Sequence, residues 1–283
     1  MITLRTLTLL LMTSAFSLTH ASPLLEVVKT VEQRLDARVG VTLYDSATGE
    51  TWDYQGDARF PMTSTFKTLA CAALLARVDG GTEDLDRRVT FDKDDLVTYS
   101  PVTETRTGEP GMTLGEICEA TMATSDNTAA NLVLNAIGGP GSVTGFVRDL
   151  GDKITRLDRT ETTLNEAAPG DPRDTTTPNA MVGNLRKLVL GNALATDSRD
   201  RLITWLKGNR VSDNLLRSAL PRDWQIGDRS GAGGYGSRSI AAVLWPPNRQ
   251  PLVLAIYITE TEASFDERNK AIAEIGSVIV KLH

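Results

Sequence analysis

The pattern of apolar and polar residues predicts β-strands towards both ends of the chain. Residues 38–45 alternate between apolar and polar side chains, as in a strand with one buried face. Residues 240–247 and 251–260 are almost continuously apolar and flank a short turn with proline and asparagine, which is typical of two buried strands. The pattern therefore predicts a sheet whose strands come from both ends of the chain.

Helical spacing dominates the rest of the sequence. Apolar residues recur every three or four positions in residues 23–36 and 267–282, and the pattern is mostly helical from residue 63 to about residue 206. Residues 159–178 form a polar stretch without periodicity that is too long for a simple connection. Loops of this kind usually serve a function or are disordered.

These elements predict an α+β fold: an antiparallel sheet built from the N- and C-terminal segments and flanked by helices, with an inserted all-helical subdomain. We assign residues 22–62 and 207–283 to the α/β subdomain. Residues 63–206 form the helical subdomain, which includes the 159–178 loop.

The first 21 residues have the features of an export signal. Arg5 is followed by an apolar centre at residues 6–18 and by small residues that end at Ala21. The apolar centre is too short for a transmembrane helix. We therefore expect an exported protein without membrane attachment after cleavage, which is periplasmic, or secreted if the host lacks an outer membrane.

Composition and charge narrow the choice of partners. The 283 residues are 41% hydrophobic and 23% charged, and the formal net charge is -6, values that are ordinary for a globular protein. The sequence contains no basic stripe and no interleaving of basic and aromatic residues, so we expect no nucleic-acid partner. A monomer is expected by default.

Two residue counts restrict the chemistry. The only histidines are His20, in the signal, and His283, at the last position, so a Ser-His-Asp triad and a histidine-bound catalytic zinc are excluded. The only cysteines are Cys71 and Cys118, for which a disulfide and two buried free thiols are the alternatives. A serine nucleophile in this chain would need a base other than histidine.

The stretch TSTFKTLACAALL, residues 63–75, places Ser64 three positions before Lys67. In a helix with about 3.6 residues per turn these two side chains lie on one face. A lysine that its neighbours keep partly neutral can accept a proton from a serine. On its own, the pattern equally fits the start of a helix with a solvated lysine.

Three further segments carry candidate chemistry. Taken singly, TSDNTAAN reads as a helix cap, LDRTETTLN as a charged surface loop and DRSGAGGYGSR as a glycine-rich turn. The candidate residues in and beside these segments are Ser125, Asp126, Asn127, Arg159, Glu161, Asn165, Asp174, Arg229, Ser230, Gly231, Ala232 and Arg238.

Together, these segments resemble the class A serine β-lactamases, which carry S-x-x-K, S-D-N and K-T-G motifs. The resemblance covers essentially the whole chain after the first 21 residues, including YSPV at 99–102, the cysteine pair and DERN at 266–269. It implies a β-lactamase/transpeptidase-like fold, a small-molecule β-lactam substrate, and neither a metal nor an organic cofactor.

The resemblance also assigns the catalytic roles. Ser64 is expected to attack the β-lactam carbonyl with Lys67 as its partner, and Ser125 to pass a proton to the leaving nitrogen. Glu161, with help from Asn165, is expected to activate the water that hydrolyses the acyl-enzyme. Whether Lys67 or Glu161 is the base in acylation stays open.

A second group of residues is expected to bind substrate. By resemblance, the backbone N–H groups of Ser64 and Ala232 form the oxyanion hole, and Arg229 and Arg238 bind the substrate carboxylate. The full set of substrate-binding candidates is Tyr99, Asn127, Asn165, Arg229, Ser230, Gly231, Ala232 and Arg238.

The loop at residues 159–178 and the motif at Arg229 differ in detail from most of the family. Arg229 stands where lysine is usual, which resembles the carbenicillin-hydrolysing subgroup, so penicillins and carboxypenicillins are the expected substrates. Thr162 follows Glu161 where many members have proline after a cis peptide bond, so the geometry of this bond stays open. Arg159 and Asp174 are expected to form the ion pair that closes the loop.

Three other functions share part of this pattern. A penicillin-binding transpeptidase or carboxypeptidase would share Ser64 and Lys67 but lack the Glu-x-x-Leu-Asn loop. A β-lactam sensor would carry a membrane span or a partner domain, which we do not expect here. A Ser-Lys esterase or peptidase would not explain Glu161 and Asn165.

Overall fold

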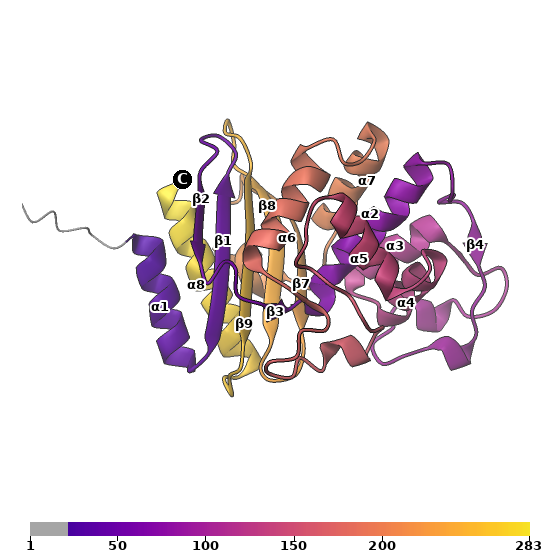
Figure 1. Cartoon of the computed structure of the whole chain (residues 1–283), viewed down its shortest axis with the longest axis horizontal. Coiled ribbons are helices and arrows are strands. Elements are labelled where there is room, and N and C mark those ends of the chain that lie inside the picture. The colour runs from indigo at the N-terminus through magenta and orange to yellow at the C-terminus, as the bar shows by residue number, and fades with distance from the viewer. Residues whose placement is uncertain (1–21) are drawn as a thin grey trace, which may run out of the picture.

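A computed structural model describes residues 22–283, in which an antiparallel sheet lies beside a group of helices (Figure 1). The predicted α+β architecture is confirmed. The export signal predicted for residues 1–21 lies outside the described residues.

The main sheet has five antiparallel strands in the order β2-β1-β9-β8-β7. Its strands are β1 (Arg38–Asp45), β2 (Thr51–Tyr54), β7 (Gln225–Ala232), β8 (Arg238–Trp245) and β9 (Leu252–Thr259). Strand β1 pairs along its whole length with β9, with Arg38 opposite Thr259 and Asp45 opposite Leu252. The two ends of the chain therefore build one sheet, as the pattern predicts. Two short ladders join β3 (Phe60–Pro61) to β6 (Thr175–Thr176) and β4 (Arg88–Val89) to β5 (Met112–Thr113).

Besides the short strands β2 to β6, the hydrophobic pattern does not predict the eight-residue strand β7. Its central residues, Gly227 to Gly231, include two glycines and three polar side chains, yet all five are buried. Each of the two charged residues has a partner from another segment: Asp228 accepts a hydrogen bond from Arg217, and Arg229 donates one to Asn209. The first part of the glycine-rich segment, up to Ala232, is thus a buried strand of the main sheet rather than a turn.

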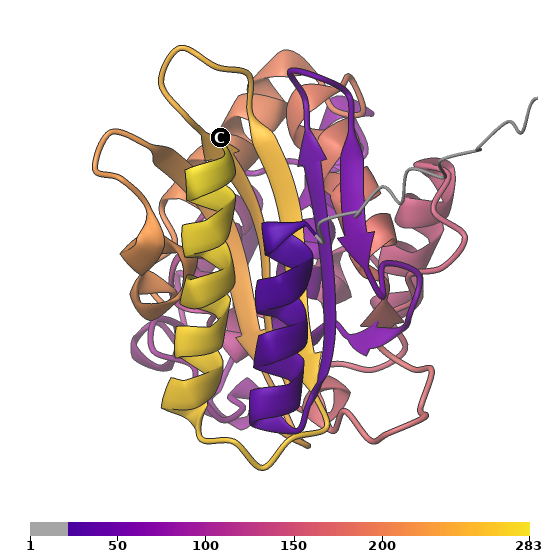
Figure 2. The same ribbon diagram turned by 90° about the vertical axis from the view of Figure 1, so that its left-hand side faces the viewer.

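Helices cover both faces of the sheet. Helices α1 (Pro23–Leu35) and α8 (Phe265–Leu282) lie side by side on one face, as Figure 2 shows, and bury apolar residues such as Val28 and Ile272 against it. Helix α8 begins two residues before its predicted start, because Ser264 and Glu267 form a reciprocal capping box. Helix α6 (Pro178–Leu185) packs against β9 and β1 on the opposite face. The predicted subdomain limits stay a prediction. Helix α6 belongs by sequence to the predicted helical segment, residues 63–206, but it packs against the sheet.

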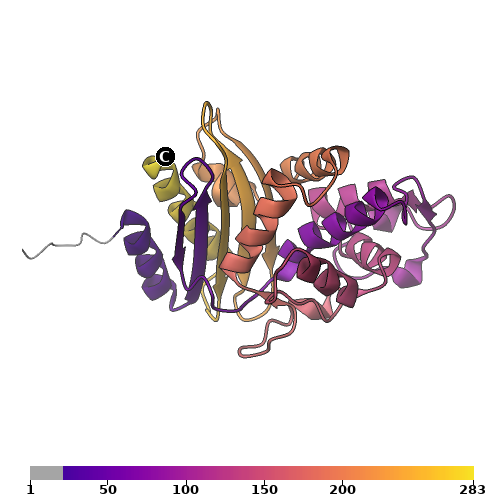
Figure 3. The ribbon, with the colours of Figure 1, turned by 45° about the horizontal axis from the view of Figure 1, so that its top comes forward.

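The helical part is built around α2 (Phe66–Asp79), in which every residue from Phe66 to Leu75 is buried. Its neighbours are α3 (Leu114–Thr124), α4 (Asn127–Ala136), α5 (Pro140–Asp149) and α7 (Thr196–Lys207) (Figure 3). Short helical turns are η1 (Thr63–Thr65), η2 (Lys93–Asp95), η3 (Thr103–Thr105), η4 (Thr163–Asn165), and the π-helical η5 (Arg186–Leu190) and η6 (Asp213–Arg217). Because residues 66–75 are buried on all sides, this part of α2 is apolar apart from Lys67 and Thr68, and the other charged residues of the helix, Arg77 and Asp79, lie in its less buried last turn.

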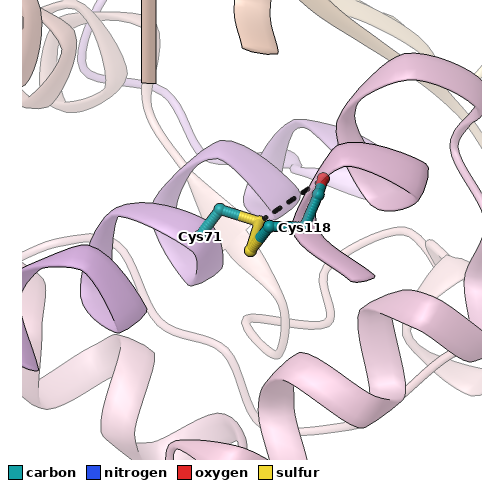
Figure 4. The surroundings of a disulfide bond; sticks show 2 residues. All are labelled: Cys71 and Cys118. Atoms are coloured by element: carbon teal, nitrogen blue, oxygen red, sulfur yellow. Dashed lines mark hydrogen bonds between the residues drawn. A yellow bond between two sulfur atoms is a disulfide. The ribbon is translucent and has the colours of Figure 1, made fainter. Parts of the chain in front are cut away.

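A disulfide between Cys71 and Cys118 joins α2 to α3 (Figure 4). Of the two alternatives that the sequence leaves open, the structure therefore has the disulfide. The bond closes a loop with a sequence separation of 47 residues. It ties the helix that begins after Ser64 to the helix that ends before Ser125.

Candidate active site

Ser64 lies in the turn η1, directly before α2, and only 7% of its surface is exposed. Lys67 follows in the first turn of α2 and is completely buried. The three-residue spacing therefore places both side chains on the face of the helix that meets the sheet and the loop after α5. This geometry argues against a solvated lysine at a helix start.

The Lys67 ammonium is surrounded by oxygen atoms. Nζ donates to the backbone oxygen of Ser125 at 2.9 Å, to Ser125 Oγ at 3.2 Å and to Asn127 Oδ1 at 2.7 Å, and it lies 3.1 Å from Glu161 Oε1. An ammonium has three N–H groups, so four oxygens compete for them. Burial lowers the pKa of Lys67 to about 8, and the negative charge of Glu161 opposes this shift. A neutral lysine is thus accessible near physiological pH.

Ser125 links Lys67 to Ser64. It adopts a left-handed conformation with φ of 64° at the end of α3, and its hydroxyl donates to Ser64 Oγ at 3.1 Å. The next residue, Asp126, caps α4 and also accepts hydrogen bonds from the backbone N–H groups of Val102 and Thr103. Asp126 therefore holds the segment after Tyr99 against the motif, a role that the cap pattern alone does not indicate.

Tyr99 and Asn127 lie beside this motif. The backbone oxygen of Tyr99 accepts a hydrogen bond from the Asn127 backbone N–H at 3.0 Å, and the Asn127 amide donates to the backbone oxygen of Thr98 at 2.9 Å. The Tyr99 side chain is 54% exposed. Such an exposed aromatic ring next to the segment of Ser125 and Asn127 can offer an apolar contact to a bound molecule.

Glu161 is 4% exposed, and its Oε1 is the oxygen that lies 3.1 Å from Lys67 Nζ. Asn165 Nδ2 donates to Glu161 Oε2 at 2.6 Å. The peptide bond between Glu161 and Thr162 is cis, so the geometry that the sequence leaves open is that of the proline-containing relatives. Asn131 exchanges two hydrogen bonds with the backbone of Glu161, at 2.8 and 2.9 Å.

Asn131 is a residue of the site that the sequence reasoning missed. It ends the segment TSDNTAAN, and in α4 it lies one turn after Asn127. Residues four apart share a helix face, so helical spacing from Asn127 was the signal that pointed to it.

The loop at residues 159–178 is closed by charged groups. Arg159 Nε lies 2.6 Å from Asp174 Oδ2, and the same arginine contacts Glu166 at 2.5 Å. The other oxygen of Asp174 accepts the backbone N–H groups of Asp158 and Arg159 at 2.8 and 2.9 Å. The expected ion pair is thus present, and Asp174 joins the two ends of the loop.

Strand β7 approaches the nucleophile very closely at Gly231. A Cβ atom at this position would lie 2.5 Å from the backbone nitrogen of Ser64 and 2.0 Å from Thr63 Oγ1. Only glycine permits this approach, because real Cβ atoms do not come within 3.0 Å of such neighbours. Ser230 is buried and Ala232, the last residue of β7, is exposed beside the nucleophile.

Two arginines lie under this end of the sheet. Arg229 is completely buried, and its Nη1 donates to Asn209 Oδ1 at 3.1 Å. Arg238 donates from Nε to Asn269 Oδ1 at 2.7 Å and from Nη1 to the backbone oxygen of Gly231 at 2.8 Å. Burial lowers the pKa of each guanidinium to about 10, so both stay charged at neutral pH.

The predicted catalytic residues Ser64, Lys67, Ser125 and Glu161 are joined by direct contacts, and Gly231 of β7 lies against the backbone of Ser64. Across residues 22–283, no group of three or more histidine, cysteine, aspartate and glutamate residues is arranged to hold a metal ion. Among the same residues, no helix is long and apolar enough to cross a membrane.

Comparison with known proteins agrees with this arrangement. The sequence model of the β-lactamase enzyme family matches residues 23–282. The chain belongs to this family. β-Lactamase AER-1 of Aeromonas hydrophila is 54% identical over 267 residues, which cover 94% of this chain and 88% of that relative. β-Lactamase CARB-4 of Pseudomonas aeruginosa is 52% identical over 255 residues, covering 90% of this chain and 88% of that relative.

Solved structures give the class. An ancestral class A β-lactamase has a TM-score of 0.90 at 54% identity and covers 92% of this chain and 100% of its own. A mutant of the chromosome-encoded β-lactamase of Vibrio parahaemolyticus also reaches 0.90, at 50% identity, covering 92% of this chain and 100% of its own. These comparisons confirm, at the level of the family, the predicted class A membership. They also confirm the hydrolysis of the β-lactam amide of penicillins and the role in β-lactam resistance.

Proposed function

We propose that this class A β-lactamase opens the β-lactam ring through an ester on Ser64 and releases the product with a water activated by Glu161. The observation that carries the proposal is an unbroken chain of polar contacts from Ser64 through Ser125 and Lys67 to Glu161. Proton transfer needs heavy atoms within hydrogen-bond distance, and each step of this chain meets that requirement.

In acylation, Ser64 Oγ forms a bond to the β-lactam carbonyl carbon, and the ring C–N bond breaks. The serine proton leaves to a base, which is one member of the Lys67–Glu161 pair, and a proton reaches the departing nitrogen through the Ser125 hydroxyl. Ser125 suits this role because its Oγ lies between Ser64 Oγ and Lys67 Nζ. The backbone N–H groups of Ser64 and Ala232 stabilise the negative charge on the carbonyl oxygen.

In deacylation, Glu161 accepts a proton from a water that attacks the ester carbon, and Ser64 leaves with its proton restored. Asn165 Nδ2 occupies one oxygen of Glu161 and so directs the other towards Lys67 and the water. Asn131 fixes the backbone of Glu161 on both sides of its side chain. The ion pair between Arg159 and Asp174 closes the loop that carries Glu161 and so keeps this residue close to Lys67 and Ser64.

Substrate binding uses the remaining residues. Arg229 and Arg238 attract the carboxylate of the substrate, Ser230 adds a hydrogen bond, and Gly231 lets the strand lie close to the acyl group. Asn127 binds the amide side chain, and Tyr99 contacts the bound molecule at the entrance. Penicillins and carboxypenicillins are the proposed substrates, in keeping with Arg229 and with relatives named CARB-3 and CARB-4.

We further infer a periplasmic location and a monomeric state. The signal-like residues 1–21 support export. An oxidising compartment also favours the disulfide between Cys71 and Cys118.

The test is turnover by the protein that lacks residues 1–21. We expect hydrolysis of benzylpenicillin, carbenicillin and a chromogenic cephalosporin over many equivalents, with the two penicillins preferred. A burst of one equivalent followed by a halt would instead identify a penicillin-binding or sensing protein. Slow hydrolysis of carbenicillin relative to benzylpenicillin would refute the proposed carboxypenicillin activity alone.

A further inference from the structure

Arg229, a residue of β7, is completely buried, and most of its hydrogen-bonding capacity is unused. Its Nη1 donates to Asn209, whereas Nε and Nη2 have no hydrogen-bond partner among the described residues. A guanidinium carries five N–H donors, and buried donors without partners cost free energy. These two nitrogens are therefore suited to a ligand that brings oxygen atoms and a negative charge.

Asn209, the only side chain in the described structure that accepts a hydrogen bond from Arg229, is itself held in one orientation. It lies two residues after α7 and is 5% exposed. Its Nδ2 donates to Ser212 Oγ at 2.8 Å and to Asp228 Oδ2 at 2.9 Å. Because an ionised carboxylate only accepts hydrogen bonds, Nδ2 faces Asp228 and Oδ1 is left to face Arg229.

The charge of Asp228 is balanced from its other side. Arg217 Nη2 lies 2.5 Å from Asp228 Oδ1, and Ser212 donates to Oδ2. Asp228 is fully buried and forms its only ion pair in the described structure with Arg217, so it makes no ion pair with Arg229 there. Arg229 thus meets a neutral amide where a carboxylate would cancel its positive charge.

We propose that Asn209 is a positioning residue that sets the preference of the enzyme for anionic substrates. It fixes the guanidinium of Arg229 through Nη1 and leaves Nε and Nη2 without a protein partner, so that they can donate to the substrate carboxylate. This inference rests on the proposed role of Arg229. Aspartate has the same shape as asparagine, but at position 209 it would pair with Arg229 and compete with the substrate.

The experiment compares Asn209→Asp with the unaltered enzyme on two substrates, benzylpenicillin and its uncharged methyl ester. We expect kcat/KM for the acid to fall about 10- to 100-fold, mainly through KM, because a charged hydrogen-bonding interaction is lost. For the ester, kcat/KM should stay within about twofold. The preference for the acid over the ester is therefore the quantity that changes.

Asn179→Asp is the matched control. The Asn179 amide also lies between a hydroxyl and a carboxylate, accepting from Thr42 Oγ1 at 2.7 Å and donating to Asp57 at 3.0 Å, but on α6. The Asn179→Asp substitution introduces the same negative charge away from the site, so the preference for the acid over the ester should stay unchanged. Asn209→Ala, which removes the acceptor without adding charge, should reduce the preference less than Asn209→Asp does.

Equal losses on acid and ester would overturn the inference, since they would assign Asn209 a purely structural role. An unchanged preference in a stably folded Asn209→Ala variant would overturn it as well, and this variant decides the matter if Asn209→Asp does not fold. Failure of the proposed function has a different signature: the unaltered enzyme would not prefer the acid, or would not turn over either substrate.

Discussion

Lys67 Nζ lies 3.1 Å from Glu161 Oε1, and neither side chain has any surface exposed to solvent. Lys67 comes from the first turn of α2, whereas Glu161 comes from the loop that Arg159 and Asp174 close. Burial lowers the pKa of Lys67 and the charge of Glu161 raises it, so the proton affinity of the lysine depends on the carboxylate. The two half-reactions thus share one electrostatic pair.

Glu161→Gln should lower the pKa of Lys67 further below its present value of about 8, because the opposing negative charge is removed. If neutral Lys67 is the acylation base, the rising limb of the acylation rate will move to lower pH in this variant. Single-turnover acylation by benzylpenicillin, followed by mass spectrometry across a range of pH, measures this limb. Loss of acylation in this variant would instead assign the acylation base to Glu161, and a limb at higher pH would contradict the predicted fall in the pKa of Lys67.

Glu161→Ala should still form the ester on Ser64 but should hydrolyse it about 10²- to 10⁴-fold more slowly, the usual contribution of a general base. Mass spectrometry of the protein after mixing with penicillin should therefore detect a stable covalent adduct. Ser64→Ala is the control and should form none. Undiminished turnover without a trapped adduct would remove Glu161 from its assigned role.

Asp174→Asn should destabilise the loop that carries Glu161. The substitution weakens the ion pair with Arg159 in a side chain that is only 1% exposed, and we expect a loss of roughly 2 kcal/mol in the free energy of unfolding. Deacylation should slow more than acylation, because the loop positions Glu161. Urea unfolding and pre-steady-state kinetics measure the two effects.

Arg173→Ala is the matched control for the loop. Its contact with Asp171 is equally close, at 2.7 Å, but the Arg173 side chain is 48% exposed. An exposed ion pair contributes little to stability, so this variant should unfold and deacylate as the unaltered enzyme does. Equal effects of Asp174→Asn and Arg173→Ala would contradict a specific role for the buried pair.

Reduction of the disulfide between Cys71 and Cys118 should destabilise the fold by about 4 kcal/mol, which is the chain-entropy estimate for a loop of this length. The melting temperature should then fall by roughly 10 °C, which thermal unfolding with and without a strong reductant measures. A variant with alanine at both positions should melt at the same temperature in both conditions. A reductant effect that persists in that variant would exclude the disulfide as its cause.

Local pattern was sufficient for most elements of the fold. Strand β1 was predicted with its observed limits, Arg38 and Asp45, because apolar and polar residues alternate in its sequence. The predicted half-exposed face was wrong: only Arg38 and Tyr44 are not fully buried, because helices cover both faces of the sheet. Strand β7 could not be predicted in this way, since its buried Asp228 is compensated by Arg217 and Ser212. Such compensation depends on tertiary contacts that a hydrophobic pattern does not contain.

The same distinction applies to the site. The serine and lysine of the first motif were visible as neighbours because one helical turn joins them. Helical spacing could place Asn131 on the face of Asn127, but the partners of Asn131 and Asn209 could not be predicted, because each acts on a residue from another element, Glu161 and Arg229 respectively. The resemblance to a known family supplied the order of the motifs, whereas the structure supplied the residues that orient them.

The contact between Gly231 and the turn that carries Ser64 has a consequence for the evolution of the enzyme. Any side chain at this position would push β7 away from the backbone nitrogen of Ser64. In a library randomised at codon 231 and grown on ampicillin, only glycine codons should survive. Adaptation to bulkier drugs must therefore proceed through other positions of the binding surface, while this one stays invariant.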